Sequence, residues 1–344
     1  MTDCTIVIPT YNRSALLHRL LTYYSQESFP HPIIVADSSK PDSSQKNRKT
    51  VEKLSSKLRV RYIHFEPSTE IFVKITQAIK EVGSTYVNLC ADDDFIVANS
   101  LARAIHFLDT HPDYVAVGGR SVVGYIREEK LSIAPVEQRP ITEDAGLNRL
   151  RQCFVRPSTT IYTAHRTKIL RKNLDRLARC RTDNTRFEEL AFSSLDAIEG
   201  KVGVMESLYA VRQSSGHRPD SGAKETKGWK HVASSPTFEK NKEIFIALLH
   251  EAAIESKVDI NKDAIEKWFT EYLHKAIASK KGRRSTYWER AVAAALLPSA
   301  PTATRKKLQC VLHVALMADS RIRTMQKEFA PIAQLLKKYP DGIL

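Results

Sequence analysis

The segment TIVIPTYNR, residues 5–13, decides the expected fold of this chain of 344 residues. Its first half is a short β-branched run that a proline closes, which is typical of a buried strand. After Ser14 the apolar residues recur with helical spacing, at Leu16, Leu17, Leu20, Leu21 and Tyr24. The sequence therefore predicts a strand, a loop and an amphipathic helix at the start of the chain.

The same alternation of strand and helix signals continues along the chain. Further strand candidates lie at residues 33–36, 60–65, 86–91 and 115–119, with helical stripes between them. This order predicts right-handed crossovers, and hence an α/β fold with a mainly parallel, Rossmann-like sheet flanked by helices. Because ligands bind such sheets at the carboxyl ends of strands, we expect the polar strand exits at Asp37 and Asp92–Asp94 to face one crevice.

The chain changes character from Pro236 onward, where apolar residues keep helical spacing and no strand signal intervenes. We therefore expect two domains, an α/β domain over residues 1–220 and a basic, all-helical C-terminal extension over residues 221–344. The stretch Ser214–Ser235 between them is rich in Ser, Gly, Lys and His. It fits an interdomain linker and an active-site loop equally well.

The chain carries 53 Lys and Arg against 39 Asp and Glu, a formal net charge of +14, and residues 221–344 hold most of the excess. Such an excess attracts phosphate-bearing partners: a nucleotide, an anionic membrane surface, nucleic acid or an acidic polymer. With 42% hydrophobic residues, the composition excludes collagen-like and wholly disordered classes.

We expect neither a signal peptide nor a transmembrane helix, because the N-terminus lacks a basic region and the apolar stretch Ala291–Leu297 is too short to span a bilayer. The five cysteines form no CxxC pair, and their odd number argues against a disulfide framework. Reduced thiols and a cytoplasmic location are the expectation.

Asp92, Asp93 and Asp94 directly follow a predicted buried strand. Three neighbouring carboxylates repel one another in a low-dielectric crevice unless a cation lies among them. Mn²⁺ or Mg²⁺ suits these hard oxygen ligands, and substrate phosphates can complete the coordination of Mg²⁺. A solvated acidic turn that stabilises the start of the next helix explains the triplet equally well.

Three motifs resemble the inverting glycosyltransferases of family 2, which have the GT-A fold. Residues 5–13 resemble their opening strand and nucleotide-binding loop, residues 33–39 their second strand with its acidic exit, and residues 77–94 the helix and strand that lead to the DxD motif. The resemblance covers roughly residues 4–215. It implies a GT-A sheet, a nucleotide-sugar donor and a divalent metal cofactor.

The resemblance also implies donor-binding roles for a loop that wraps the base and ribose, comprising Pro9, Thr10, Tyr11 and Arg13. Asp37 is then expected to accept a hydrogen bond from the base, which suits the N3–H of uracil and hence a UDP-sugar. Without the resemblance, Tyr11 is explained by packing against the first helix and Asp37 by turn formation.

Three consecutive Asp residues permit two registers of the DxD motif. We assign the metal to Asp94 and Asp92, with Asp93 a direct ligand in the other register, and the earlier carboxylates also contact the ribose or the sugar. The family often has a basic residue on the helix before the DxD motif, and none is evident here. Lys74 is the nearest cation on that helix, and we assign it to the diphosphate. His217 is expected in a basic loop over the pyrophosphate, although a plain surface position fits it equally well.

The catalytic base of the family lies in an acidic pair, which Glu188 and Glu189 resemble, with Glu189 at the position that is usually Asp. Either carboxylate can take the proton of an acceptor hydroxyl as its oxygen attacks the anomeric carbon. The competing interpretation is an exposed acidic pair in the first turn of a helix, and it is stronger for Glu188.

The expected function is metal-dependent transfer of a sugar from a UDP-sugar to an acceptor hydroxyl with inversion, in cell-surface polysaccharide or glycolipid synthesis. The acceptor can be lipid-linked, which would place the enzyme peripherally at the inner surface of an anionic membrane. A homodimer is a further expectation, and nucleic-acid binding is disfavoured. The alternative is a non-catalytic nucleotide- or carbohydrate-binding scaffold that kept the fold, because a fold does not establish a function.

Overall fold

The computed structural model describes residues 3–127, 130–179, 181–214, 228–278 and 320–340. Within these ranges the strands belong to one sheet. They are β1 (Cys4–Thr10), β2 (Ile33–Asp37), β3 (Val60–His64), β4 (Tyr86–Leu89), β5 (Phe95–Ile96), β6 (Tyr114–Arg127), β7 (Lys130–Val136), β8 (Ala164–Arg166) and β9 (Lys201–Ser214).

The described helices connect these strands in the N-terminal part and follow them in the C-terminal part. They are α1 (Ser14–Gln26), α2 (Pro41–Leu54), α3 (Ile71–Lys80), α4 (Ala98–Thr110), α5 (Gly146–Val155), α6 (Thr167–Arg179), α7 (Thr185–Glu199), α8 (Trp229–Ala233), α9 (Phe238–Glu255), α10 (Lys262–Ala278) and α14 (Ser320–Lys338). None of the helices in the described ranges combines the length and apolar character needed to cross a bilayer.

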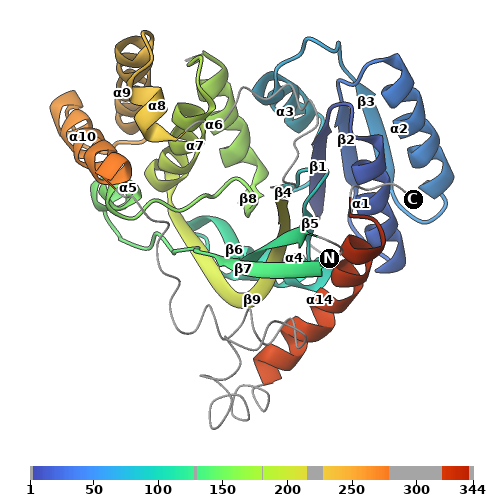
Figure 1. The fold of residues 1–344 in the computed structure, drawn as a ribbon. Coiled ribbons are helices and arrows are strands. Elements are labelled where there is room, and N and C mark those ends of the chain that lie inside the picture. Colours follow the sequence, from blue (N-terminus) through green and yellow to red (C-terminus); the bar gives the residue numbers. More distant parts are fainter. Residues whose placement is uncertain (1–2, 128–129, 180, 215–227, 279–319, 341–344) are drawn as a thin grey trace.

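The strand order is β3-β2-β1-β4-β8-β6-β9-β5, with β7 paired to β6. The first four strands are parallel, whereas β8 is antiparallel to both β4 and β6. Figure 1 shows the sheet curling from the upright strands β1–β3 to β6, β7 and β9, which run across the lower part of the view. The predicted α/β class with a flanked sheet is confirmed, and the sheet is parallel on one side of β4 and mixed on the other.

The core lies on both faces of the sheet because successive side chains of a strand point to opposite sides. Ile6 and Ile8 join a hydrophobic cluster with α1, α2, α4 and α14. Val7, between them, joins a second cluster with α3 and the helices from α5 to α10. Cys4 is buried as a free thiol in the first cluster. A sheet covered on both faces leaves its strand ends as the place for a site.

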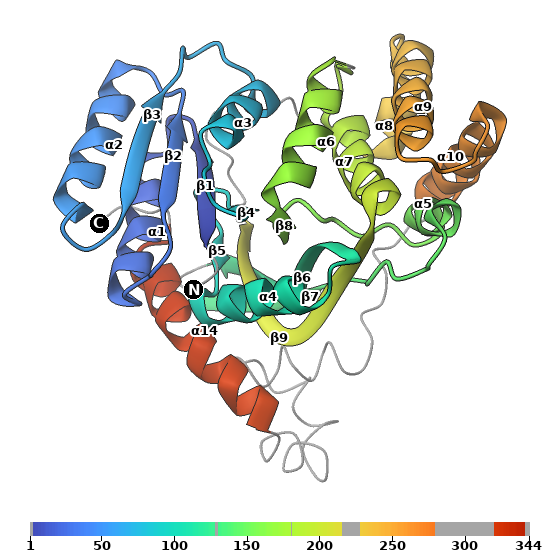
Figure 2. The same cartoon turned by 180° about the vertical axis from the view of Figure 1, so that it is seen from behind.

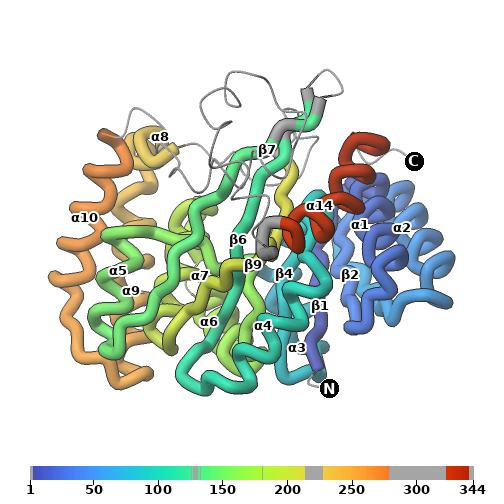
Figure 3. Tube along the Cα trace, turned by 90° about the horizontal axis from the view of Figure 1, so that it is seen from below, coloured from blue at the N-terminus to red at the C-terminus, as the bar shows by residue number. Residues whose placement is uncertain are grey.

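The C-terminal part packs on the α/β part at two separate places. Figure 2 shows α8, α9 and α10 gathered beside α5, α6 and α7, at the end of the molecule away from α1 and α2. Figure 3 shows α14 lying against α1 and β9, and both contacts are apolar. The described residues after 228 form helices and no strand, as expected. The expected domain boundary at residue 220 lies outside the described residues, so the division into two domains stays a prediction.

An aromatic cluster joins α10 to the α/β part, and we predict that it accounts for several kcal/mol of stability. Phe269 is fully buried, with ring centroids 5.6 Å from Phe187, 5.2 Å from Phe245 and 5.7 Å from Trp229. Phe269→Ala should lower the free energy of unfolding in urea by about 3–5 kcal/mol, because it removes a large buried ring and leaves a cavity. Ile254→Ala, at a side chain that is 61% exposed, is the matched control and should change it by less than about 0.5 kcal/mol. A loss below about 1 kcal/mol for Phe269→Ala would contradict this packing.

Candidate active site

The loop after β1 is fixed to the loop after β2 by a reciprocal pair of hydrogen bonds. The backbone N–H of Asn12 donates to Oγ of Ser39 at 2.7 Å, and the backbone N–H of Lys40 donates to Oδ1 of Asn12 at 3.0 Å. Asn12 adopts a φ of 54°, in the left-handed region that Asn tolerates better than most residues. The two loops predicted to hold the donor therefore form one continuous surface, with Pro9 and Tyr11 partly exposed on it.

Asp37 is fully buried, and its carboxylate organises the β2 exit. It accepts hydrogen bonds from the backbone N–H of Ser39 at 2.7 Å, from Nδ2 of Asn47 at 2.8 Å and from the hydroxyl of Tyr62 at 2.7 Å. A carboxylate has about four lone-pair sites, so these three donors leave one for a ligand. Asp37 thus supports the loop whether or not it also contacts a base.

Lys74 joins the two acidic strand exits that the sequence places in one crevice. Its buried ammonium donates to the carbonyl of Thr10 at 2.7 Å and to Oγ of Ser38 at 2.8 Å. Burial lowers the pKa of Lys74 to about 8, while the nearby Asp92 and Asp37 act in the opposite direction. The exits of β1, β2 and β4 therefore meet around one cation, which contacts neither carboxylate directly.

Asp92 is buried and held by the β1 loop on both oxygens. Oγ1 of Thr10 donates to one of them and Nη1 of Arg13 to the other, each at 2.7 Å. The second Nη of Arg13 donates to Asp93 at 2.8 Å, so this guanidinium bridges two carboxylates of the triplet. Burial raises the pKa of Asp92 to about 6, although Arg13 opposes the shift. Three predicted donor-site residues, Thr10, Arg13 and Asp92, are in direct contact.

Asp94 faces the end of β9 rather than the β1 loop. Its Oδ1 accepts the backbone N–H of Gln213 at 3.0 Å, and its Oδ2 lies 3.5 Å from Nε of Arg212. Burial, followed by the charge of Asp93, raises the pKa of Asp94 to about 7. Arg212 also lies over the ring of Tyr162, 4.8 Å from its centroid.

Asp92 and Asp93 share the guanidinium of Arg13, whereas Asp94 faces Arg212 at the end of β9. Among the described residues no group of three His, Cys, Asp or Glu side chains is arranged as a metal centre. Their chemistry nevertheless suits a hard divalent cation, because carboxylate oxygen is its preferred ligand. The raised pKa values of Asp92 and Asp94 show that neighbouring cations only partly balance their buried charge. Asp94 fits best, since within the described chain its Oδ2 has Arg212 as its one partner, at 3.5 Å.

Glu188 lies in the first turn of α7, Glu189 follows it directly, and Asn184 is the N-cap of the helix. The Oδ1 of Asn184 accepts the backbone N–H of Arg186 at 2.9 Å. Glu189 is 42% exposed and forms an ion pair with Arg186 at 3.6 Å. Burial lowers the pKa of Arg212, but Asp94 and, more weakly, Glu189 raise it overall. The charge of Glu189 therefore reaches Arg212, and its direct contact is with Arg186 of its own helix. His217 lies outside the described residues.

The sequence analysis missed two residues of this site, Arg19 and Tyr162. Arg19 is fully buried, and its Nη2 donates to the backbone carbonyl of Asp93 at 3.3 Å. The signal was present, because Arg19 lies three residues after Leu16 and four before Tyr23 on the apolar face of α1. Tyr162 lies in an irregular segment before β8, where neither periodicity nor a motif marks it.

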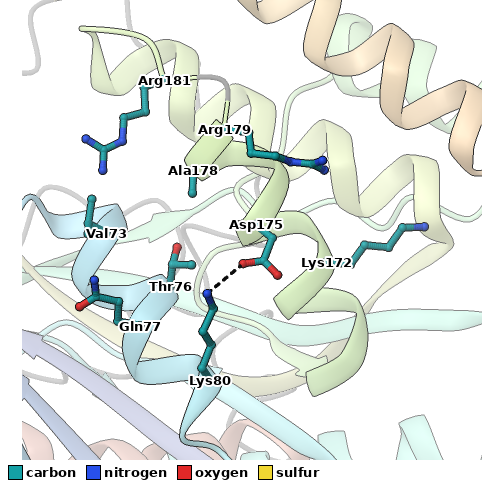
Figure 4. Close-up of a pocket in the computed structure, with 9 residues that line it drawn as sticks. All are labelled: Val73, Thr76, Gln77, Lys80, Lys172, Asp175, Ala178, Arg179 and Arg181. Carbon is teal, nitrogen blue, oxygen red and sulfur yellow. Dashed lines mark ion pairs between the residues drawn. The ribbon is translucent and has the colours of Figure 1, made fainter.

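A separate cavity of about 610 Å³ lies between α3 and α6 (Figure 4). Its wall contains four cations and one carboxylate, and Lys80 lies 3.7 Å from Asp175 across it. The lining residues are Val73, Thr76, Gln77, Lys80, Lys172, Asp175, Ala178, Arg179 and Arg181. None of the predicted site residues lines this cavity. Lys74, the predicted site residue on α3, lies on the opposite, buried face of that helix.

Solved structures of similar fold include two of TarS from S. aureus. Residues 1–349 of TarS from S. aureus, in complex with UDP-GlcNAc, align with a TM-score of 0.54 and 17% identity, over 97% of this chain and 92% of that chain. The same segment of TarS without a named ligand aligns with a TM-score of 0.50, 17% identity and the same coverage. At these identities the similarity establishes the fold. Among curated proteins no sequence matches significantly.

The family model described as "Glycosyl transferase family 2" matches residues 5–177. The match includes the β1 loop, the β2 exit and Asp92–Asp94, the elements that meet at the strand ends. The chain thus belongs to glycosyl transferase family 2, and it is a glycosyltransferase with a GT-A type fold.

Proposed function

We propose that this enzyme transfers a sugar from a UDP-sugar to an acceptor hydroxyl, with inversion at the anomeric carbon and with the help of a divalent metal. The observation that carries the proposal is the pair of buried carboxylates with raised pKa values, Asp92 and Asp94, where the β1 loop meets the end of β9. Such perturbed groups cluster at functional sites. Family membership identifies the reaction class as glycosyl transfer, in which buried carboxylates can bind a metal ion.

The donor half of the proposal rests on the joined loops after β1 and β2. Their surface offers Tyr11 and Asn12 to a nucleoside, and the buried carboxylate of Asp37 supports that surface from below with three hydrogen bonds. The TarS segment of the same fold is solved with UDP-GlcNAc, which makes UDP the first nucleotide to test. Asp94, with Asp92 or Asp93, would hold Mn²⁺ or Mg²⁺, whose charge offsets that of the diphosphate leaving group.

The acceptor half rests on Glu189. In a single displacement the base removes the proton of the attacking hydroxyl from the face opposite the leaving group, which inverts the anomeric carbon. The side chain of Glu189 is 42% exposed, so a substrate hydroxyl can reach its carboxylate, and its charge acts on Arg212, which faces Asp94. The cation Arg212 also stabilises negative charge that develops on the diphosphate.

The net charge of +14 supports an acceptor or surface that carries phosphate, as in a lipid-linked acceptor for cell-surface polysaccharide or glycolipid synthesis at an anionic membrane. The basic runs at Lys280–Arg284 and Arg305–Lys307, which motivate this part of the proposal, lie outside the described residues, and a homodimer is also still a prediction.

We predict that Asp94→Asn and Asp92→Asn weaken metal-dependent donor binding. Each change removes the negative charge and one of the two acceptor oxygens of the carboxylate, while the amide oxygen that remains can still accept one of the existing hydrogen bonds. Calorimetric titration of UDP with and without MnCl₂ should show that the affinity gained from the metal falls by roughly 10–100-fold. Glu188→Gln, which changes a carboxylate outside the triplet, should leave that gain intact. An unchanged gain in both Asp variants would exclude the triplet as the metal site.

The raised pKa values of Asp92 and Asp94 predict two opposite pH dependences. Metal must displace the protons, so the Mn²⁺-dependent affinity for UDP should rise as the pH increases from 5 to 8, through the values of about 6 and about 7. Between the unfolded pKa near 4 and these values the folded state binds more protons, so the free energy of unfolding should fall as the pH rises through that window. Asp94→Asn should flatten both curves. Curves that Asp94→Asn leaves unchanged would contradict the assignment.

Glu189→Gln should lower the rate of transfer by roughly 10²–10⁴-fold, because it keeps the shape of the side chain but removes the proton acceptor. Donor affinity should stay near that of the wild type, since neither metal nor nucleotide binding uses this group. Glu188→Gln is the matched control and should be the milder change. Transfer at the wild-type rate in Glu189→Gln would reject the assignment, and loss of donor binding would instead place Glu189 in the donor site. If no nucleotide-sugar supports transfer or hydrolysis, the chain is a non-catalytic binder.

A further inference from the structure

The buried guanidinium of Arg19 connects the aspartate triplet to the far end of the chain. Its Nη1 donates to the backbone carbonyls of Tyr339, at 2.9 Å, and Pro340, at 3.3 Å, while Nη2 donates to the carbonyl of Asp93 at 3.3 Å. Its Cζ lies 5.2 Å from the centroid of the Phe95 ring. One fully buried cation thus joins α1, the triplet and the residues that follow α14.

Gln213 makes a second, independent connection between the same two places. Its side-chain Nε2 donates to the carbonyl of Pro340 at 2.6 Å, and its backbone N–H donates to Oδ1 of Asp94 at 3.0 Å. A single residue therefore links the carbonyl of Pro340 to each aspartate: Arg19 links it to Asp93, and Gln213 links it to Asp94.

The body of α14 is anchored firmly enough to hold these carbonyls in place. Phe329, Ile332 and Leu336 are buried in the cluster shared with α1 and β9, and Figure 3 shows the helix crossing both elements. Glu328, 6% exposed, pairs with Arg103 of α4 at 2.7 Å. The carboxyl end of a helix also carries partial negative charge, which favours a cation such as Arg19.

We propose that the end of α14 is a part of the donor site, and that Tyr339 and Pro340, through the positioning residues Arg19 and Gln213, hold the aspartate triplet in the position from which it would bind metal and donor. This proposal rests on the proposed function of the triplet. A buried guanidinium needs acceptors for its N–H groups. The carbonyls of residues 339 and 340 supply them, and they thereby keep Arg19 from pairing with the carboxylate of Asp93 or Asp92.

Without these carbonyls, Arg19 has the triplet as its nearest source of negative charge, because Asp93, Asp92 and Asp94 are the carboxylates that act on it. A guanidinium paired with those carboxylates competes with a metal ion for them. Metal-dependent nucleotide affinity should therefore fall, whereas the affinity for the nucleotide alone, which the β1 and β2 loops provide, should change little.

The test uses two truncations of the chain, one after Lys338 and one after Gly342, which leaves Pro340 with an ordinary peptide carbonyl. The first removes both carbonyls, and the second keeps them and serves as the matched control. Titration of UDP with and without MnCl₂ should show the metal-dependent gain in affinity reduced by about tenfold after the first truncation and unchanged after the second. Gln213→Leu, which removes the Pro340 contact but keeps the backbone bond to Asp94, should give a smaller loss of the same kind.

Arg103→Met separates this role from general stabilisation of α14. It breaks the ion pair with Glu328 far from the triplet and should lower the melting temperature, yet it should leave the metal-dependent gain intact. If Arg103→Met lowers that gain as much as the truncation after Lys338 does, or if this truncation leaves the gain unchanged, the proposal is wrong.

Hydrogen–deuterium exchange of the ligand-free protein tests the proposal without relying on donor binding. Amides of residues 92–95 should exchange faster after truncation at Lys338 and at the wild-type rate after truncation at Gly342. Equal exchange in both would overturn the proposal. If the wild type shows no metal-dependent affinity for UDP, the proposed function fails, and the exchange result alone decides whether α14 positions the triplet.

Discussion

The site depends on balancing three carboxylates that follow β4, of which Asp92 and Asp94 are buried and Asp93 is partly exposed. Arg13 bridges Asp92 and Asp93, Arg212 faces Asp94, and Lys74 lies among the strand exits without touching a carboxylate. Each of these cations comes from a different part of the fold. The carboxylates are therefore balanced only when the loop after β1, helix α3 and the end of β9 are in their folded positions. The balance is incomplete, because burial still raises the pKa values of Asp92 and Asp94. A site in this condition is stabilised by one more cation, which is the physical basis of metal dependence in our account.

The parallel side of the sheet could be predicted from the sequence, because each of its strands is a short apolar run that a polar exit closes. The meeting of Asp37 with Asp92 follows from the rule that such exits share one edge. The mixed side could not be predicted in the same way. β6 and β9 are 14-residue strands with register shifts, and β8 is only three residues long, so local periodicity is weak there and pairing depends on distant segments.

The site itself was predictable only as far as its motifs extend. Thr10, Arg13, Lys74 and the triplet come together as contacts among residues that the sequence analysis had singled out. The sequence analysis could not predict which way each carboxylate points. Asp94 turns toward β9 and Asp92 turns toward β1, and no spacing rule encodes that difference. The role of Arg19 illustrates the same limit, since its partners at residues 339 and 340 are more than 300 positions away.

The most direct test of the central claim is a titration of the carboxylates themselves. With ¹³C-labelled aspartate, NMR of the ligand-free protein should show two carboxyl resonances with midpoints near pH 6 and 7, which Asp92→Asn and Asp94→Asn assign. Adding UDP with Mg²⁺ should shift both midpoints downward, because a bound cation favours the ionised carboxylates. Midpoints near the ordinary value of about 4 for every aspartate, or midpoints that Mg²⁺ and UDP leave unchanged, would contradict the account.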